Sequence, residues 1–77
     1  MAELLEYLAR QLVDEPDAVR VDEEEDEYGG VVLHLHVAEE DVGKVIGRQG
    51  RIARALRTIV RAGAARESHR VLVEIVD

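Results

Sequence analysis

Gly47 and Gly50 enclose Arg48 and Gln49 in the segment Val-Ile-Gly-Arg-Gln-Gly-Arg-Ile of this 77-residue chain. Glycine has no Cβ, so another backbone can approach such a turn closely. The two central side chains can donate hydrogen bonds to the oxygens of a phosphate or a sugar. The spacing therefore predicts a turn that contacts the backbone of a phosphate-bearing ligand.

A helix is expected to begin directly after Gly50. The N–H groups of the first turn of a helix have no partner within that helix, and they favour phosphate oxygens. Lys44, Arg51 and Arg54 lie within about one helical turn of the glycines and add positive charge. This combination strengthens the prediction of an anion-binding turn.

A Gly-x-x-Gly turn alone is a weak signal, because glycines at helix junctions are commonly structural. Here the apolar neighbours Val45, Ile46 and Ile52 are expected to fix the angle between two helices and to wall a groove for unstacked bases. The basic flank and a predicted strand on each side also favour binding over a plain corner. The candidate binding residues are Lys44, Val45, Ile46, Gly47, Arg48, Gln49, Gly50, Arg51, Ile52 and Arg54.

The net charge of −7 argues, at face value, against a nucleic-acid ligand. The charges are segregated, however, because residues 1–41 hold fourteen acidic residues and only two arginines. Residues 43–66 hold seven basic residues and no acidic one. Screening limits electrostatic reach to about 8–10 Å at physiological salt, so a ligand responds to the local charge. The distribution therefore favours an anionic ligand at the glycine turn.

The composition bounds the class of protein. The length allows one small domain, which we place at residues 1–77, and 47% hydrophobic residues can fill its core. The absence of cysteine removes disulfides and cysteine-ligated metal sites and fits a reducing cytoplasm. No apolar run approaches the roughly 20 residues that span a bilayer, and the first ten residues lack the features of a secretory signal. We expect a cytoplasmic protein without a membrane segment.

The hydrophobic periodicity predicts an α+β domain. Helical spacing of leucines indicates a helix over 2–13, and alternation indicates strands near 19–21, over 31–37 and over 71–76. A short helix is expected from Glu39 and a longer one over 51–64. The order helix–strand–strand–helix–helix–strand predicts an antiparallel hairpin and a parallel crossover. The result would be a three-stranded mixed sheet with all helices on one face.

The longer helix is expected to have an apolar side and a basic side. The apolar side comprises Ile52, Ala55, Leu56, Ile59 and Val60. The basic side comprises Arg51, Arg54, Arg57 and Arg61. We expect Arg57 and Arg61 to form a solvated surface. They would add to the positive electrostatic field near the turn rather than contact the ligand directly. Residues 66–69 are predicted to form the exit from this helix.

The segment Asp-Val-Gly-Lys-Val-Ile-Gly-Arg-Gln-Gly-Arg-Ile resembles the signature of the KH domain, whose loop clamps about four nucleotides. The order of elements is similar to the type II arrangement, and the whole chain resembles the small bacterial proteins of the KhpA family. The resemblance implies an RNA-binding protein and RNA chaperone that pairs with itself or with a KhpB-type KH protein. It also implies a role in cell elongation and envelope homeostasis. Gln49 departs from many KH loops, in which both central positions are basic.

Other kinds of site receive less support. His34, His36 and His69 are read as ordinary polar residues rather than metal ligands, and no cofactor is expected. Thr58 and Ser68 are the only hydroxyl nucleophiles of their kind, and neither has an evident base beside it. A nucleotide-binding loop would need Gly-x4-Gly-Lys-Ser/Thr, which is not present. The sequence therefore favours a binding protein over an enzyme.

The alternative to a single-stranded RNA-binding module is a protein-interaction domain in which RNA contact is secondary. The acidic run Glu23–Glu27 is expected to form a solvated hairpin that discourages edge-to-edge strand pairing. Val32, Leu72 and Val76 are expected on the sheet face away from the helices. An exposed apolar strip there would serve as a dimer contact. Single-stranded DNA also stays open as a ligand, because a phosphate clamp does not read the 2′-hydroxyl.

Overall fold

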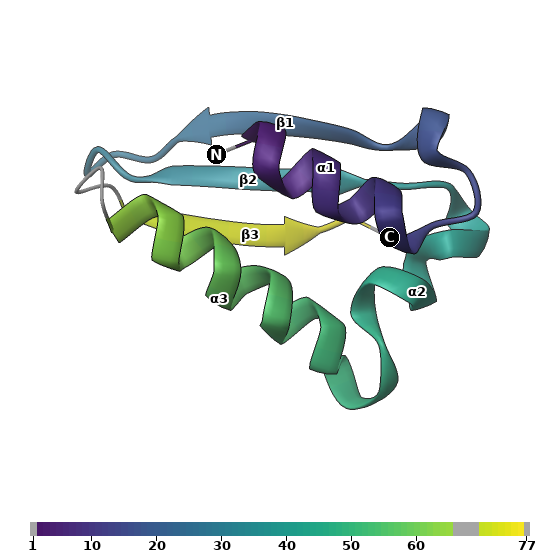
Figure 1. Ribbon diagram of the computed structural model, residues 1–77. Coiled ribbons are helices and arrows are strands. Elements are labelled where there is room, and N and C mark those ends of the chain that lie inside the picture. Colours follow the sequence, from purple (N-terminus) through teal and green to yellow (C-terminus); the bar gives the residue numbers. More distant parts are fainter. Residues whose placement is uncertain (1, 66–69, 77) are drawn as a thin grey trace.

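The computed structural model describes residues 2–65 and 70–76. In these residues three α-helices and three strands follow one another in the order helix–strand–strand–helix–helix–strand (Figure 1). They are α1 (Ala2–Leu12), β1 (Arg20–Glu25), β2 (Val31–His36), α2 (Val42–Ile46), α3 (Arg51–Ala65) and β3 (Val71–Ile75). The predicted order of elements is confirmed. No helix in these two ranges is both long and apolar enough to cross a membrane.

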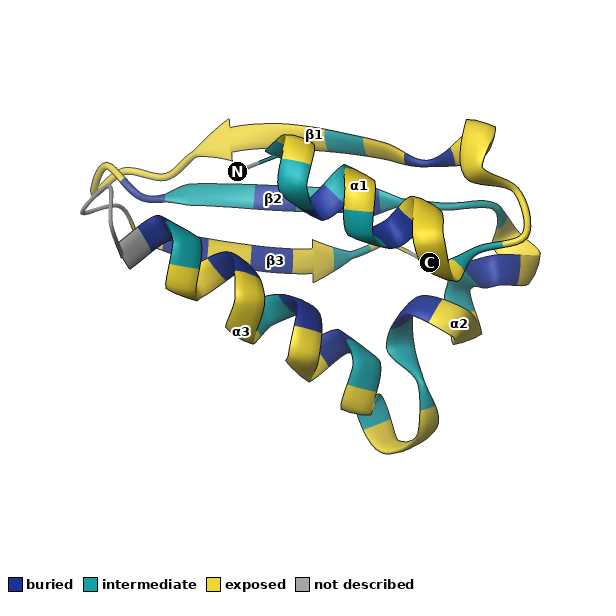
Figure 2. Cartoon of the chain, in the orientation of Figure 1, coloured by how far each residue is buried: buried dark blue, intermediate teal, exposed yellow. Residues whose placement is uncertain are grey.

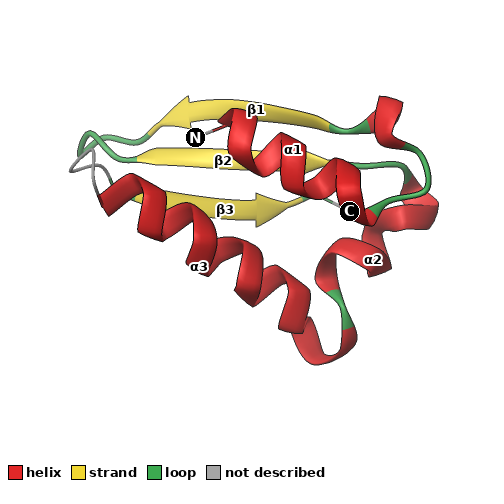
Figure 3. Ribbon diagram, viewed as in Figure 1, coloured by secondary structure: helices red, strands yellow, loops and turns green. Residues whose placement is uncertain are grey.

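The sheet has the order β1-β2-β3 and is mixed, as predicted. β1 pairs antiparallel with β2, so that Val21 lies opposite Leu35. β2 pairs parallel with β3, so that Leu33 lies opposite Val73. The helices lie on one face of this sheet (Figures 1 and 3). The domain is therefore an α+β sandwich of two layers.

The acidic run Glu23–Glu27 lies on a solvated hairpin, as predicted, but the strand that contains most of it is longer than the predicted 19–21. β1 extends through Glu25, so most of the run belongs to the strand itself, and its acidic residues are exposed (Figure 2). β1 is an edge strand, so solvent hydrates these carboxylates while the backbone pairs with β2. The turn that follows is where the sequence predicts it. Asp26 Oδ1 accepts hydrogen bonds from the N–H groups of Tyr28 at 2.8 Å and of Gly30 at 2.7 Å.

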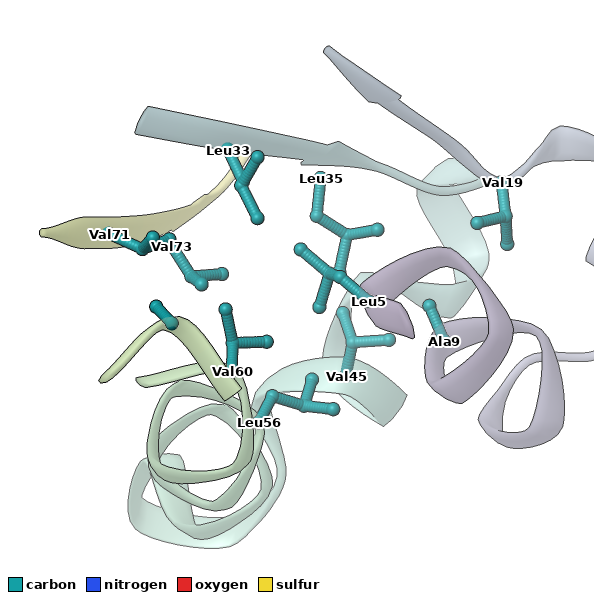
Figure 4. Close-up of a cluster of buried hydrophobic side chains, with 11 residues drawn as sticks. Leu5, Ala9, Val19, Leu33, Leu35, Val45, Leu56, Val60, Val71 and Val73 are labelled. Carbon is teal, nitrogen blue, oxygen red and sulfur yellow. The ribbon is translucent and has the colours of Figure 1, made fainter. Parts of the chain in front are cut away.

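The core lies between the sheet and the helices (Figure 4). Alternation along β2 turns Leu33 and Leu35 toward the helices, and both are fully buried. Leu5 from α1 and Val45 from α2 meet them there. The other buried members of this core are Ala9, Val19, Leu56, Val60, Ala64, Val71 and Val73. Because α2 contributes a core residue, packing of the domain fixes the short helix that precedes the glycine turn.

The buried face of α3 is rotated relative to the predicted apolar side. Leu56 and Val60 are buried as expected, but Ala53 is also buried at 4% exposure. Ile59 is 44% exposed, and Ala55 is exposed too. Small alanines allow α3 to approach the sheet closely, whereas the apolar residues on its other flank stay outside the core. The predicted apolar side of α3 therefore includes residues, Ala55 and Ile59, that lie outside the core.

Candidate nucleic-acid interface

A buried carboxylate fixes the start of α2. Asp41, which is 1% exposed, is the last residue of the short 3-10 turn Glu39–Asp41 and directly precedes α2. Its Oδ2 accepts a hydrogen bond from the N–H of Glu15 at 3.0 Å, and its Oδ1 lies 3.2 Å from Lys44 Nζ. Lys44 Nζ also contacts Asp14 Oδ2 at 2.8 Å. The segment after α1 is thereby attached to α2.

Opposing effects act on the pKa of Asp41. Burial alone would raise it, but hydrogen bonds from the backbone of Glu15 and Asp14, together with Lys44, lower the pKa below its ordinary value. The same contacts raise the pKa of Lys44, through Asp14 first and Asp41 second. Asp41 is therefore held ionised at neutral pH. The sequence predicts Asp41 as an acid in the first turn of a helix, but it does not reveal these partners.

The glycine turn joins α2 to α3 through a backbone conformation that side chains rarely adopt. Gly47 has φ 75° and ψ 173°, a region that is essentially confined to glycine. A Cβ at this position would stand 2.7 Å from Ile52 Cγ1. The missing side chain thus lets the first turn of α3 pack against the backbone at the end of α2. This contact sets the angle between the two helices.

The tip of the turn is also left-handed. Gln49 has φ 57° and Gly50 has φ 74°. The carbonyl of Gln49 accepts a hydrogen bond from Arg54 Nη2 at 2.8 Å, and the N–H of Gly50 donates to the carbonyl of Gly47 at 3.1 Å. Arg54 therefore holds the turn from within α3. The turn is built to a defined shape, and the side chains of Arg48 and Gln49 stand exposed at its tip.

The ten candidate residues are contiguous in space, but they lie at different depths. Arg48, Gln49, Arg51 and Arg54 are exposed around the turn, as is Lys44. The two isoleucines and the two glycines of this set are half-buried, namely Ile46, Gly47, Gly50 and Ile52. Val45 is fully buried in the core. Val45 can support the turn from beneath. The prediction that Val45 walls a groove was wrong, because its side chain is not exposed.

Several cations near the turn already contact protein groups. Lys44 pairs with two carboxylates, and Arg54 bonds to the Gln49 carbonyl. Arg57 is half-buried rather than solvated, and its Nε donates a hydrogen bond to the carbonyl of Val73 in β3 at 3.3 Å. The prediction of a solvated Arg57 was therefore wrong. Arg48 and Arg51 are the exposed cations at the turn for which the described residues provide neither an ion pair nor a side-chain hydrogen bond.

An apolar groove of about 370 Å³ runs between α1 and α3. It is lined by Leu8, Gln11, Leu12, Arg51, Ile52, Ala55, Leu56 and Ile59. The apolar periodicities of both helices contain these residues, but periodicity alone does not separate a core stripe from a surface groove. The predicted apolar side of α3 is wider than one buried face, and this width is the sequence signal that could have revealed the groove. The groove begins beside the glycine turn at Arg51 and Ile52.

The histidines pair with carboxylates on the outer face of the sheet. His36 Nε2 lies 3.0 Å from Asp22, and His34 lies 3.4 Å from Glu24 and 3.6 Å from Glu74. His69 and the predicted helix exit at 66–69 lie outside the described residues. On the same face, Leu72 and Val76 are 45% and 38% exposed, as expected for a strip on the side away from the helices.

Two helices joined by a Gly-x-x-Gly turn, over one face of a three-stranded mixed sheet, form the arrangement of a KH domain. A family profile described as KhpA/KhpB, KH domain matches residues 2–75. This chain therefore belongs to the KhpA/KhpB KH domain family.

The relatives are small proteins of similar length. The chain is 54% identical over 76 residues to the RNA-binding protein KhpA of Clostridium acetobutylicum, covering 99% of this chain and all of that protein. It is 53% identical over 76 residues to the protein of the same name from Caldanaerobacter subterraneus, with the same coverage. It is 48% identical over 77 residues to the KhpA of Aquifex aeolicus, covering this whole chain and 96% of that protein.

The first prediction concerns the Asp41 carboxylate. A carboxylate whose pKa is lowered by folding stabilises the fold above the pKa of the unfolded chain, and this stability is lost as the pH falls through the folded pKa. The free energy of unfolding should therefore decline below about pH 4. In Asp41→Asn this acid-dependent decline should be smaller, and the midpoint at pH 7 should be several degrees lower. Urea denaturation from pH 7 to pH 3 measures the pH dependence, and a thermal melt at pH 7 measures the shift of the midpoint. An unchanged pH dependence would contradict the assignment.

The second prediction separates the glycines. Gly47→Ala should destabilise the fold by about 2–4 kcal/mol, because backbone strain adds to the contact with Ile52. Gly50→Ala meets no atom within 4 Å and should cost only about 1–2 kcal/mol from its positive φ. Gly43→Ala, within α2 and also in open space, is the matched control and should be neutral or stabilising. Chemical denaturation gives the three values, and equal effects of Gly47→Ala and Gly43→Ala would refute the packing argument.

Proposed function

We propose that this chain is a cytoplasmic RNA-binding protein that clamps the backbone of single-stranded RNA at the Gly-x-x-Gly turn. The observation that supports this most directly is the exposed Arg48–Gln49 tip, in which Gln49 is held left-handed just before α3. The tip side chains present donors suited to phosphate oxygens, and the dipole of α3 makes the potential at its start more positive. The names of the relatives, RNA-binding protein KhpA, point to the same ligand.

The apolar residues around the turn suit this ligand. Ile46 and Ile52 are half-buried on either side of the glycines, so their free surfaces can contact unstacked bases. Arg51 adds charge at the first position of α3. The chain has no Phe or Trp, so it lacks the stacking platform of an RRM. We therefore expect weak binding by one copy with a marked salt dependence.

The family resemblance extends the proposal. It implies an RNA chaperone that acts as a homodimer, or as a heterodimer with a KhpB-type KH protein, with a role in cell elongation and envelope homeostasis. This part rests on the resemblance alone. Two linked copies would raise the overall avidity for RNA by making the second contact intramolecular.

A second candidate function is protein interaction, and the groove between α1 and α3 favours it. Leu12 and Ile59 are 37% and 44% exposed at this groove, and its lining is almost entirely apolar. We propose a second copy of this chain as the occupant. Two copies that pack these grooves against one another would remove the exposed surfaces of Leu12 and Ile59 from water.

The RNA proposal predicts the behaviour of a loop variant. Arg48→Asp combined with Gln49→Asp should reduce affinity for single-stranded RNA at least about 100-fold, because donors are replaced by negative charge. The circular dichroism spectrum should not change, since aspartate tolerates the left-handed backbone at position 49. Arg20→Asp combined with Tyr28→Asp, on the exposed β1–β2 hairpin, adds the same charge and should bind nearly as the wild type does. Fluorescence anisotropy measures the RNA affinity of the wild type, the loop variant and the control. Intact binding in the loop variant would refute the proposal.

The groove proposal predicts a different variant. Ile59→Asp places a charge in the groove about two helical turns from Ile52 and should abolish self-association in sedimentation velocity. Thr58→Asp, at the neighbouring exposed position, should leave self-association unchanged. Heterodimer formation with a KhpB-type protein can be measured with the same pair of variants. A monomeric wild type, or equal effects of the two substitutions, would contradict the proposed homodimer.

A further inference from the structure

A line of arginines leads away from the glycine turn along α3. Arg54, Arg57 and Arg61 are three and four residues apart, so they share one flank of the helix. The hydrogen bond from Arg57 to the carbonyl of Val73 shows that this flank faces β3. It is the opposite flank from the apolar groove, which Ala55 and Ile59 line. The positive charge therefore continues from the turn along the seam between α3 and β3.

A pocket of about 420 Å³ lies at the far end of this seam. Among the described residues that line it, those at the starts of β2 and β3 are apolar, and three others carry charged side chains. The lining residues are Asp26, Val31, Val32, Arg61, Arg70, Val71 and Leu72. The volume is in the range of small-ligand sites. The pocket thus combines an apolar floor with two guanidinium groups.

The two arginines are accessible to a ligand. The side chain of Arg70 is 75% exposed, and its contact with Asp26 is long, at 3.7 Å. Arg61 is exposed, and the described residues provide no ion pair for it. Guanidinium groups bind phosphate through paired hydrogen bonds, and apolar walls accommodate a base or a ribose. Asp26 also lines the pocket, and its carboxylate can accept a hydrogen bond from an exocyclic amino group.

We propose that this pocket binds one further nucleotide of the RNA strand held at the glycine turn. Arg61 and Arg70 contact its phosphate, and Val31, Val71 and Leu72 contact its base or ribose. From Arg51 to Arg61 the helix rises about 15 Å, so the strand must extend beyond the roughly four nucleotides clamped at the turn. This inference rests on the proposed RNA-binding function and adds a second contact to it.

The test compares oligoadenylates of four and ten nucleotides, using the full chain. In ¹⁵N-correlated NMR titrations, both should shift the amides of residues 47–51, and only the decamer should shift those of Val71 and Leu72. Arg61→Gln combined with Arg70→Gln should weaken decamer binding about tenfold and lower the salt slope by one to two units. Its affinity for the tetramer should not change. Arg10→Gln combined with Arg20→Gln removes the same charge elsewhere and is the matched control.

The outcomes distinguish the pocket from the turn. A decamer affinity within twofold of wild type in the Arg61/Arg70 variant overturns the pocket. An equal loss for the tetramer, or an equal loss in the control, also overturns it, because the arginines would then act only through the general field. If neither oligomer shifts residues 47–51, the proposed function fails at the glycine turn itself. Shifts at the turn without decamer-specific shifts at Val71 and Leu72 refute the pocket alone.

Discussion

The contact between the backbone of Gly47 and the side chain of Ile52 is the constraint on which the candidate interface depends. A Cβ at position 47 would approach Ile52 to 2.7 Å, so only glycine allows α3 to begin this close to the end of α2. The resulting angle places Gln49 in a left-handed conformation that a residue other than glycine adopts at a cost of about 1–2 kcal/mol. Packing of Val45 and Leu56 in the core, and the bond from Arg54 to the Gln49 carbonyl, hold the turn in that shape. The tip is therefore organised by protein contacts alone.

The same contacts divide the basic residues by role. Lys44 is paired with the carboxylates of Asp14 and Asp41, whereas Arg54 keeps its charge but holds the turn through its bond to the Gln49 carbonyl. Arg48 and Arg51 stay available at the turn. The acidic residues of β1 lie on the far edge of the sheet, on the opposite side of β2 from β3. They are thus separated from the turn, which lies in a segment, residues 43–66, with seven basic residues and no acidic one, although the chain as a whole is acidic.

The order of elements, the sheet topology and the position of the turn were predictable, because each follows from local periodicity and glycine spacing. The strand pairing followed from connection lengths, since a tight turn joins β1 to β2 and a long crossover joins β2 to β3. The roles of Asp41, Lys44 and Arg57 were not predictable. Each depends on a partner at least sixteen residues away, namely Glu15, Asp14 and Val73. The burial of Val45 and the exposure of Ile59 also depend on how α2 and α3 are rotated against the sheet, which one helix's sequence does not specify.

The most direct test is a structure of the chain bound to a single-stranded oligoadenylate. The account predicts phosphate oxygens within hydrogen-bonding distance of the backbone N–H groups and side chains of Arg48 and Gln49 and of the Arg51 side chain, with the strand continuing along the arginine flank of α3. An RNA strand seated in the groove between α1 and α3, with no phosphate at the glycine turn, would contradict it.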